Sequence, residues 1–153
     1  EANLTITSGW TLWDGQPDNI RLIPYRMAFH GMQNVAYLGA VPRKDLIKIQ
    51  QRTEIFANSN RYQELFCIAA AEAQVAGALP VSSTIGALET TVLHGKIYGN
   101  PDSVDWQNQF VDAVVQGLQV KTPALRDELK KQARERFSLE RILQQWNEKV
   151  LCL

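Results

Sequence analysis

The sequence is poor in cysteine and has no excess of either charge. Its 153 residues include two cysteines, Cys67 and Cys152, which are too few for a disulfide-stapled scaffold. The 16 Lys and Arg residues balance the 16 Asp and Glu residues, so the formal net charge is zero and no nucleic-acid partner is expected. The two histidines, His30 and His94, stand apart from each other and from the cysteines. No metal site is therefore expected from residue spacing.

Long apolar runs and the common nucleotide-binding motifs are missing as well. No run reaches the roughly 18 apolar residues of a membrane-spanning helix, and the chain does not open with a signal peptide. The patterns GxGxxG and GxxxxGK[ST], which mark dinucleotide and P-loop sites, do not occur. The remaining composition, 45% hydrophobic and 21% charged, is typical of a globular domain. We expect one domain over residues 1–153 and a cytoplasmic location.

The start of the chain is unusual for a complete protein. It begins at Glu1 without a methionine and enters a strand-like run at Leu4 almost at once. We therefore expect this sequence to be a piece of a longer chain.

Short strand-like runs alternate with helix-like stretches. Strands are predicted at residues 4–8, 35–38, 54–57, 79–82 and 95–99. Helices are predicted at 19–32 with a start or kink at Pro24, from Pro42 onward, at 64–75, at 104–118, at 123–136 and from Ser138 onward, and residues 85–87 open a loop and a short helix that runs through Val92. This order predicts an α/β fold, a three-layer Rossmann-like domain with a parallel sheet and helices on both faces. A flavodoxin-like receiver ranks lower, because it needs paired acids after the first strand, where residues 8–10 read Ser-Gly-Trp.

Two of the C-terminal helices are expected to bury an apolar face. In the helix at 104–118 this face would consist of Trp106, Phe110, Val111, Val114, Val115 and Leu118. In the last helix it would consist of Leu139, Ile142, Leu143 and Trp146. Trp106 and Trp146 are therefore interpreted as core or interface residues, whereas Trp10 and Trp13 follow the first strand and could serve either packing or sugar stacking.

Ligands of an open parallel sheet bind beyond the carboxyl ends of its strands. Three loops qualify, at residues 8–10, 39–41 and 58–64. The third leads into the Ala-rich helix predicted to start at Glu64. Its first turn would offer the unpaired N–H groups of Leu65, Phe66, Cys67 and Ile68 to an anion such as a diphosphate.

Glu64 and Glu72 are the acidic residues of that helix. If both were helical, they would be about 2.2 turns and 12 Å apart along the axis, at an angle of roughly 80°. They would then be placed to hold two ends of one extended ligand rather than to act as a directly coupled acid and base. Ordinary alternatives stay open, because an acid stabilises a helix start and Glu72 could be a solvated helix residue.

The segment at residues 62–81 reads YQELFCIAAAEAQVAGALPV. It resembles the E-x7-E signature of retaining, nucleotide-sugar-dependent glycosyltransferases of the GT-B fold (the group 1 type). Residues 35–39, the glycine-containing loop at 84–89 and residues 134–138 match that family in order and spacing, so the resemblance covers nearly the whole chain. It implies the C-terminal, donor-binding half of such an enzyme, a Rossmann-like domain.

The resemblance also implies residue roles. Glu64 would be the catalytic-site carboxylate that holds hydroxyls of the transferred sugar, and Glu72 would bind the ribose. Backbone N–H groups of Phe66, Cys67 and Ile68 would reach the phosphates and the sugar. The loop at Gly39, Ala40 and Val41 would meet the base. Departures from the family pattern are Leu65 in place of a small residue, the longer loop at 60–62, and Asn58-Ser59 in place of Pro-Ser.

The partners implied are a uridine or guanosine diphosphate sugar, an acceptor that the sequence does not identify, and a missing N-terminal domain. No cofactor or metal is expected, and a hexosyltransferase is implied for the whole protein. The Arg and Lys that neutralise the diphosphate in the family would precede Glu1, so the isolated chain is expected to be inactive. Two alternatives stay open: a non-catalytic α/β interaction module, and contact of the basic helix face at 130–136 with the cytoplasmic face of a membrane.

Overall fold

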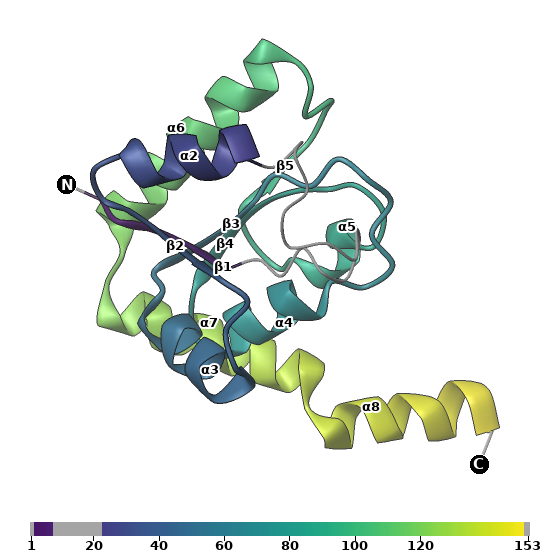
Figure 1. The fold of residues 1–153 in the computed structure, drawn as a ribbon. Coiled ribbons are helices and arrows are strands. Elements are labelled where there is room, and N and C mark those ends of the chain that lie inside the picture. The colour runs from purple at the N-terminus through teal and green to yellow at the C-terminus, as the bar shows by residue number, and fades with distance from the viewer. Residues whose placement is uncertain (1, 8–22, 152–153) are drawn as a thin grey trace. The chain divides into compact units, whose positions relative to one another are not determined.

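The computed structural model describes residues 2–7 and 23–151 (Figure 1). The predictions for the loop at 8–10, for Trp10 and Trp13, and for residues 19–22 fall outside these ranges. The chain divides into two compact units, Glu1–Leu46 and Ile47–Leu153. The expectation of a single domain stays a prediction.

The first unit is built on a parallel strand pair. β1 (Leu4–Thr7) pairs with β2 (Val35–Gly39), with a register irregularity after Ile6. Along the chain, α2 (Ile23–Gly31) lies between these strands and carries Pro24 in its first turn. Proline is tolerated there because a backbone N–H at this position would have no partner within the helix. The predicted strand–helix–strand order is thus confirmed. After Pro42 the chain enters α3 (Arg43–Arg52), close to the predicted start.

The second unit contains a parallel three-stranded sheet in the order β3-β4-β5. Its strands are β3 (Ile55–Asn58), β4 (Leu79–Ser83) and β5 (Lys96–Ile97). Its helices are α4 (Ile68–Val75), α5 (Leu88–Thr91), α6 (Val104–Val120), α7 (Pro123–Phe137) and α8 (Leu139–Trp146), which continues as a π-helical turn at Asn147–Leu151. The predicted α/β class and parallel pairing are confirmed in both units.

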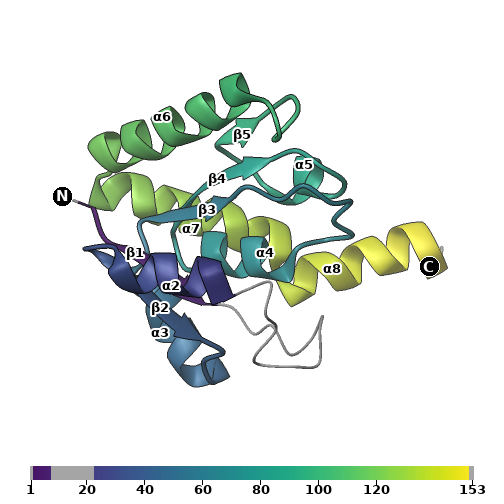
Figure 2. The ribbon, with the colours of Figure 1, turned by 45° about the horizontal axis from the view of Figure 1, so that its top comes forward.

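Helices cover both faces of this sheet, as Figure 2 shows: α6 lies on one face, and α4 with α7 lies on the other. Side chains of neighbouring strand residues point to opposite faces. Accordingly, Ile55 packs with Val81 and Trp106 on the α6 side. Its neighbour Phe56 packs with Ala70 and Leu88, in a separate cluster on the α4 side.

The buried face of α6 differs from the predicted one. Trp106 is buried, and its indole N–H donates to the carbonyl of Ile97, which confirms a core role. Val111 and Val115, however, are 58% and 47% exposed. Phe110 and Val114 do pack against the core as predicted, together with Ala113. The same face includes Gly117, where an added Cβ would lie 2.8 Å from Cδ1 of Ile55, so the sheet leaves no room for a side chain at that position.

The predicted apolar side of α8 is not buried in the described part of the chain. The exposed apolar residues of this segment are Leu139, Ile142, Leu143, Trp146, Val150 and Leu151. Trp146 is thus no core residue here, and its use at an interface stays a prediction. On the basic face of α7, Lys130 pairs with Asp127 and Arg136 donates to the carbonyl of Thr90. Among the described helices, none has the length and apolar character needed to cross a bilayer.

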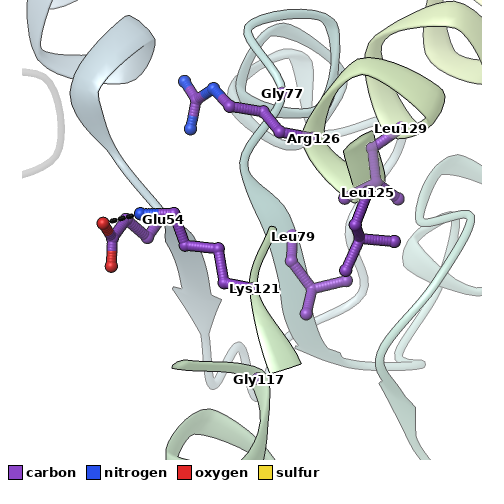
Figure 3. Close-up of a pocket in the computed structure, with 8 residues that line it drawn as sticks. All are labelled: Glu54, Gly77, Leu79, Gly117, Lys121, Leu125, Arg126 and Leu129. Carbon is purple, nitrogen blue, oxygen red and sulfur yellow. Dashed lines mark ion pairs between the residues drawn. The ribbon is translucent and has the colours of Figure 1, made fainter. Parts of the chain in front are cut away.

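The amino ends of β3 and β4 border a small pocket lined by side chains of α6 and α7. Figure 3 shows Lys121 reaching Glu54, with which it forms an ion pair, and Leu125 and Leu129 on the opposite wall. Arg126 projects from α7 and donates to three backbone carbonyls, those of Gln51, Thr53 and Ala76. These carbonyls belong to the C-terminal ends of α3 and α4 or directly follow them, where the helix dipole stabilises a positive charge. Arg126 therefore links the C-terminal ends of both helices to α7.

Replacing Arg126 with Ala should destabilise the protein. Three carbonyls lose a charged donor; a hydrogen bond to a charged group contributes a net of about 1.5–3 kcal/mol, and water can partly replace the donor at the part-buried carbonyls. We expect the free energy of unfolding, measured by urea denaturation, to fall by about 2–3 kcal/mol. Arg141→Ala is the matched control, because exposed Arg141 bonds to Gln144 through its guanidinium, and its loss should cost less than about 0.5 kcal/mol. Equal effects of the two changes would contradict this role.

Candidate functional site

The carboxyl ends of β3 and β4 meet at the candidate site. Asn58 ends β3 and Ser83 ends β4. The Ser83 hydroxyl, which is buried, donates to the carbonyl of Asn60 over 2.8 Å. This bond ties the loop after β3 to the end of the neighbouring strand. The site thus lies at the sheet edge where the sequence predicted it.

Glu64 is not part of the helix, which corrects the sequence-based prediction. Its backbone forms an isolated parallel bridge with Gly86, in the loop after β4. The N–H of Ala87 donates to the carbonyl of Glu64 over 2.7 Å. The helical geometry predicted for Glu64 and Glu72, about 12 Å along one axis, therefore does not apply. Glu64 is held instead between two loops at the strand ends.

The helix α4 begins four residues later than predicted. Its N-cap is Cys67, which has φ 62° and ψ 74°, a left-handed conformation that is unusual outside glycine. The N–H groups of Ala70 and Ala71 donate to the carbonyl of Cys67. Ile68 and Ala69 come before Ala70, the first residue whose N–H is bonded within the helix, so their N–H groups are the first-turn donors available to a ligand. Leu65, Phe66 and Cys67 precede the helix rather than forming its first turn.

The Glu64 side chain is half-buried and is oriented by polar neighbours. The Asn60 amide nitrogen Nδ2 lies 3.5 Å from Oε2 of Glu64. The pKa of the Tyr62 hydroxyl is raised, mainly by partial burial and next by the nearby Glu64 charge, and a hydrogen bond to Glu64 adds to the rise. A carboxylate that is held in this way can accept hydrogen bonds from hydroxyl groups of a ligand.

Cys67 is a free, half-buried thiol. Burial is the main cause that raises its pKa, and the Glu64 charge raises it further. The Ala70 N–H and the Asn58 amide oppose this rise, and Nδ2 of Asn58 lies 3.6 Å from Sγ. Burial and the Glu64 charge thus both favour the protonated thiol over the thiolate.

Glu72 lies in the middle of α4 and is half-buried. Nε2 of Gln50, from the C-terminal half of α3, donates to its Oε2 over 3.3 Å. Glu72 is thus a positioned carboxylate, which argues against the alternative of a freely solvated helix residue.

The other predicted donor-binding residues lie in varied places. Leu65 and Ile68 are 92% and 65% exposed. Phe66 makes an edge-to-face contact with Phe137, with ring centroids 6.1 Å apart. Gly39, Ala40 and Val41 belong to the first unit, at the carboxyl end of β2, where Gly39 takes a φ of +64°. Their predicted contact with the base stays a prediction.

Sequence reasoning missed several residues that build this site. They are Gln50, Asn58, Asn60, Tyr62, Ser83 and Gly86. The run Asn58-Ser59-Asn60 signals a turn, since asparagine side chains hydrogen-bond to the backbone two residues onward. This signal could have identified Asn58 and Asn60 as residues that shape the loop before Glu64. In the described ranges, no group of three or more His, Cys, Asp or Glu side chains could hold a metal ion.

Comparisons with known proteins identify a family and a similar fold. A family model described as "Glycosyl transferases group 1" matches residues 15–136. Two solved structures of Anabaena Alr3699/HepE, one in complex with UDP-glucose and one with UDP, resemble this chain in fold with a TM-score of 0.71 each. Their sequences are 19% and 20% identical to it, over 99% of this chain and 41% of theirs. This chain therefore spans about two fifths of that protein's length. The search of curated proteins returned no match.

Replacing Gly86 with Ala should disrupt the site. Gly86 has φ +62°, and an added Cβ would lie 2.5 Å from the carbonyl oxygen and 2.6 Å from the nitrogen of Glu64. The left-handed strain and the collision should together lower the free energy of unfolding by about 2–4 kcal/mol. Gly31→Ala is the same change at a helical position with no atom within 4 Å of the new Cβ. It should shift that free energy by less than about 1 kcal/mol. Equal urea midpoints for the two variants would contradict the close approach.

Proposed function

Because the chain belongs to the glycosyl transferases group 1 family, we propose that it is the domain that binds the nucleotide-sugar donor in a retaining glycosyltransferase. The observation that supports this most directly is the placement of Glu64. Its backbone is bridged to Gly86 and its carboxylate is held by Asn60 and Tyr62, at the carboxyl edge of parallel strands. Parallel α/β sheets bind ligands at this edge.

We propose the following roles in donor binding. The Glu64 carboxylate accepts hydrogen bonds from hydroxyls of the transferred sugar, and Glu72, held by Gln50, accepts them from the ribose. The diphosphate lies against the N-terminus of α4, where the N–H groups of Ile68 and Ala69 are available and the helix dipole favours negative charge. The N–H groups of Phe66 and Cys67, just before the helix, are further candidates. The structures of HepE with UDP-glucose and with UDP make uridine the first base to test.

The proposed chemistry is transfer of a hexosyl group with retention of configuration. As the bond from the anomeric carbon to the diphosphate breaks, positive charge develops on the sugar and negative charge on the leaving diphosphate. Preorganised donors at a helix start stabilise the negative charge without reorganising during the reaction. No metal is invoked in this scheme.

Titration of the isotope-labelled chain with UDP-glucose and with UDP tests the binding role. We expect saturable NMR shifts of backbone amides near Ile68 for both ligands. Glu72→Ala should lower the affinity for both ligands by roughly tenfold or more, since both carry the ribose and hydrogen bonds to a charged group are lost. Glu64→Ala should lower the affinity for UDP-glucose alone. Glu140→Ala, which removes an exposed carboxylate of α8, is the control and should change neither affinity.

The outcomes of this titration separate the two candidate functions. If the folded chain binds neither UDP-glucose, UDP nor the guanosine equivalents, the non-catalytic interaction module is favoured. If Glu64→Ala weakens UDP as much as UDP-glucose, the assignment of Glu64 to the sugar is wrong.

The chain by itself should transfer no sugar. It spans 41% of the length of HepE, and a transferase must position donor and acceptor together. Such positioning supplies roughly 7–11 kcal/mol of barrier lowering, and we propose that residues outside this chain provide part of it. Incubation with radiolabelled UDP-glucose and a panel of acceptors should therefore show no product above background. Product formation that Glu64→Ala abolishes would contradict this prediction.

A further inference from the structure

Asn60 is the buried polar residue closest in sequence to the proposed sugar-binding carboxylate, and its relative exposure is 8%. Its Oδ1 accepts the N–H of Tyr62 over 3.1 Å, and its Nδ2 donates to the carbonyl of Tyr62 over 3.1 Å. The second hydrogen on Nδ2 is then left for Oε2 of Glu64 at 3.5 Å. Both ends of the amide are thus committed to the segment that carries Glu64.

The backbone of Asn60 is fixed as firmly as its side chain. Its N–H donates to Oδ1 of Asn58 over 3.2 Å, and its carbonyl accepts the Ser83 hydroxyl over 2.8 Å. A buried amide is costly unless it is hydrogen-bonded. Here each polar group of Asn60 has a partner, and the partners lie on the ends of two strands and in the loop between Asn58 and Glu64. Asn60 therefore connects the rigid sheet edge to the Glu64 carboxylate.

We propose that Asn60 is a positioning residue for Glu64, which presets the orientation of the carboxylate toward the hydroxyls of the donor sugar. The contact at 3.5 Å is longer than the usual 2.9 Å of an N–H···O bond. Asn60 therefore acts mainly by shaping the turn at Tyr62, with the direct contact as a second restraint. Tyr62 supports the carboxylate from the same turn. This inference rests on the proposed function of Glu64.

A double-mutant cycle on the full chain tests the inference, with UDP-glucose and UDP as ligands and NMR titration as the readout. Asn60→Ala should lower the affinity for UDP-glucose by roughly two- to tenfold, the range expected for loss of one or two hydrogen bonds. It should leave the affinity for UDP unchanged, because UDP lacks the transferred sugar that Glu64 is proposed to bind. In the Glu64→Ala background, Asn60→Ala should have no further effect on UDP-glucose.

Two further variants keep the test decisive. Tyr62→Phe removes a hydroxyl from a side chain that is 59% exposed and should leave folding intact. It should weaken UDP-glucose, again only when Glu64 is present, and it decides the question if Asn60→Ala does not fold. Asn100→Ala is the matched control, since Oδ1 of Asn100 accepts the N–H of Asp102 in the same two-residue pattern. This control should change neither affinity.

Three results would overturn the inference. An equal loss of UDP and UDP-glucose affinity in Asn60→Ala would show a general structural role. The same fold loss with and without Glu64 would show that Asn60 does not act through it. If Glu64→Ala itself leaves both affinities unchanged, the proposed function of Glu64 fails and this inference fails with it. The first two results would leave the role of Glu64 standing.

Discussion

The backbone bridge between Glu64 and Gly86 is the constraint on which the candidate site depends. It brings the loop after β4 against the loop after β3, and it requires a residue without a Cβ, because an added Cβ would lie 2.5 Å from the Glu64 carbonyl oxygen. Since Glu64 is committed to this bridge, the chain must turn before a helix can start. Cys67 makes that turn in the left-handed conformation, and α4 follows.

The two edges of the sheet in the second unit have different tasks. At the amino edge, Arg126 donates to three carbonyls and Lys121 pairs with Glu54, so charges there are used for cohesion. At the carboxyl edge, the polar groups instead hold one another in the loop that carries Glu64. This division allows the candidate binding edge to carry charge and strain while the opposite edge holds the helices in place.

Much of the secondary structure was predictable from the sequence. The strand at 35–38, the proline-started helices and the α/β order all follow from local pattern and turn residues. Boundaries failed where tertiary contacts overrode propensity. Leu65 to Cys67 were expected to be helical, yet Glu64 is bridged to Gly86 and the helix starts only at Ile68. Val111 and Val115 of α6 suit a core, yet they are exposed, because the face of the helix that meets the sheet runs through Trp106, Val114 and Gly117.

The sequence by itself determined the α/β class and the resemblance to a transferase family, because these depend on residue types in linear order. Only the tertiary structure decided how Glu64 is held. Asn60 lies in the loop after β3, whereas Ser83 and Gly86 lie at the end of β4 and just after it, and no local pattern states that these two parts of the chain meet. Parallel strands bring them together, because consecutive strands end at the same edge of a sheet while their loops remain far apart in sequence.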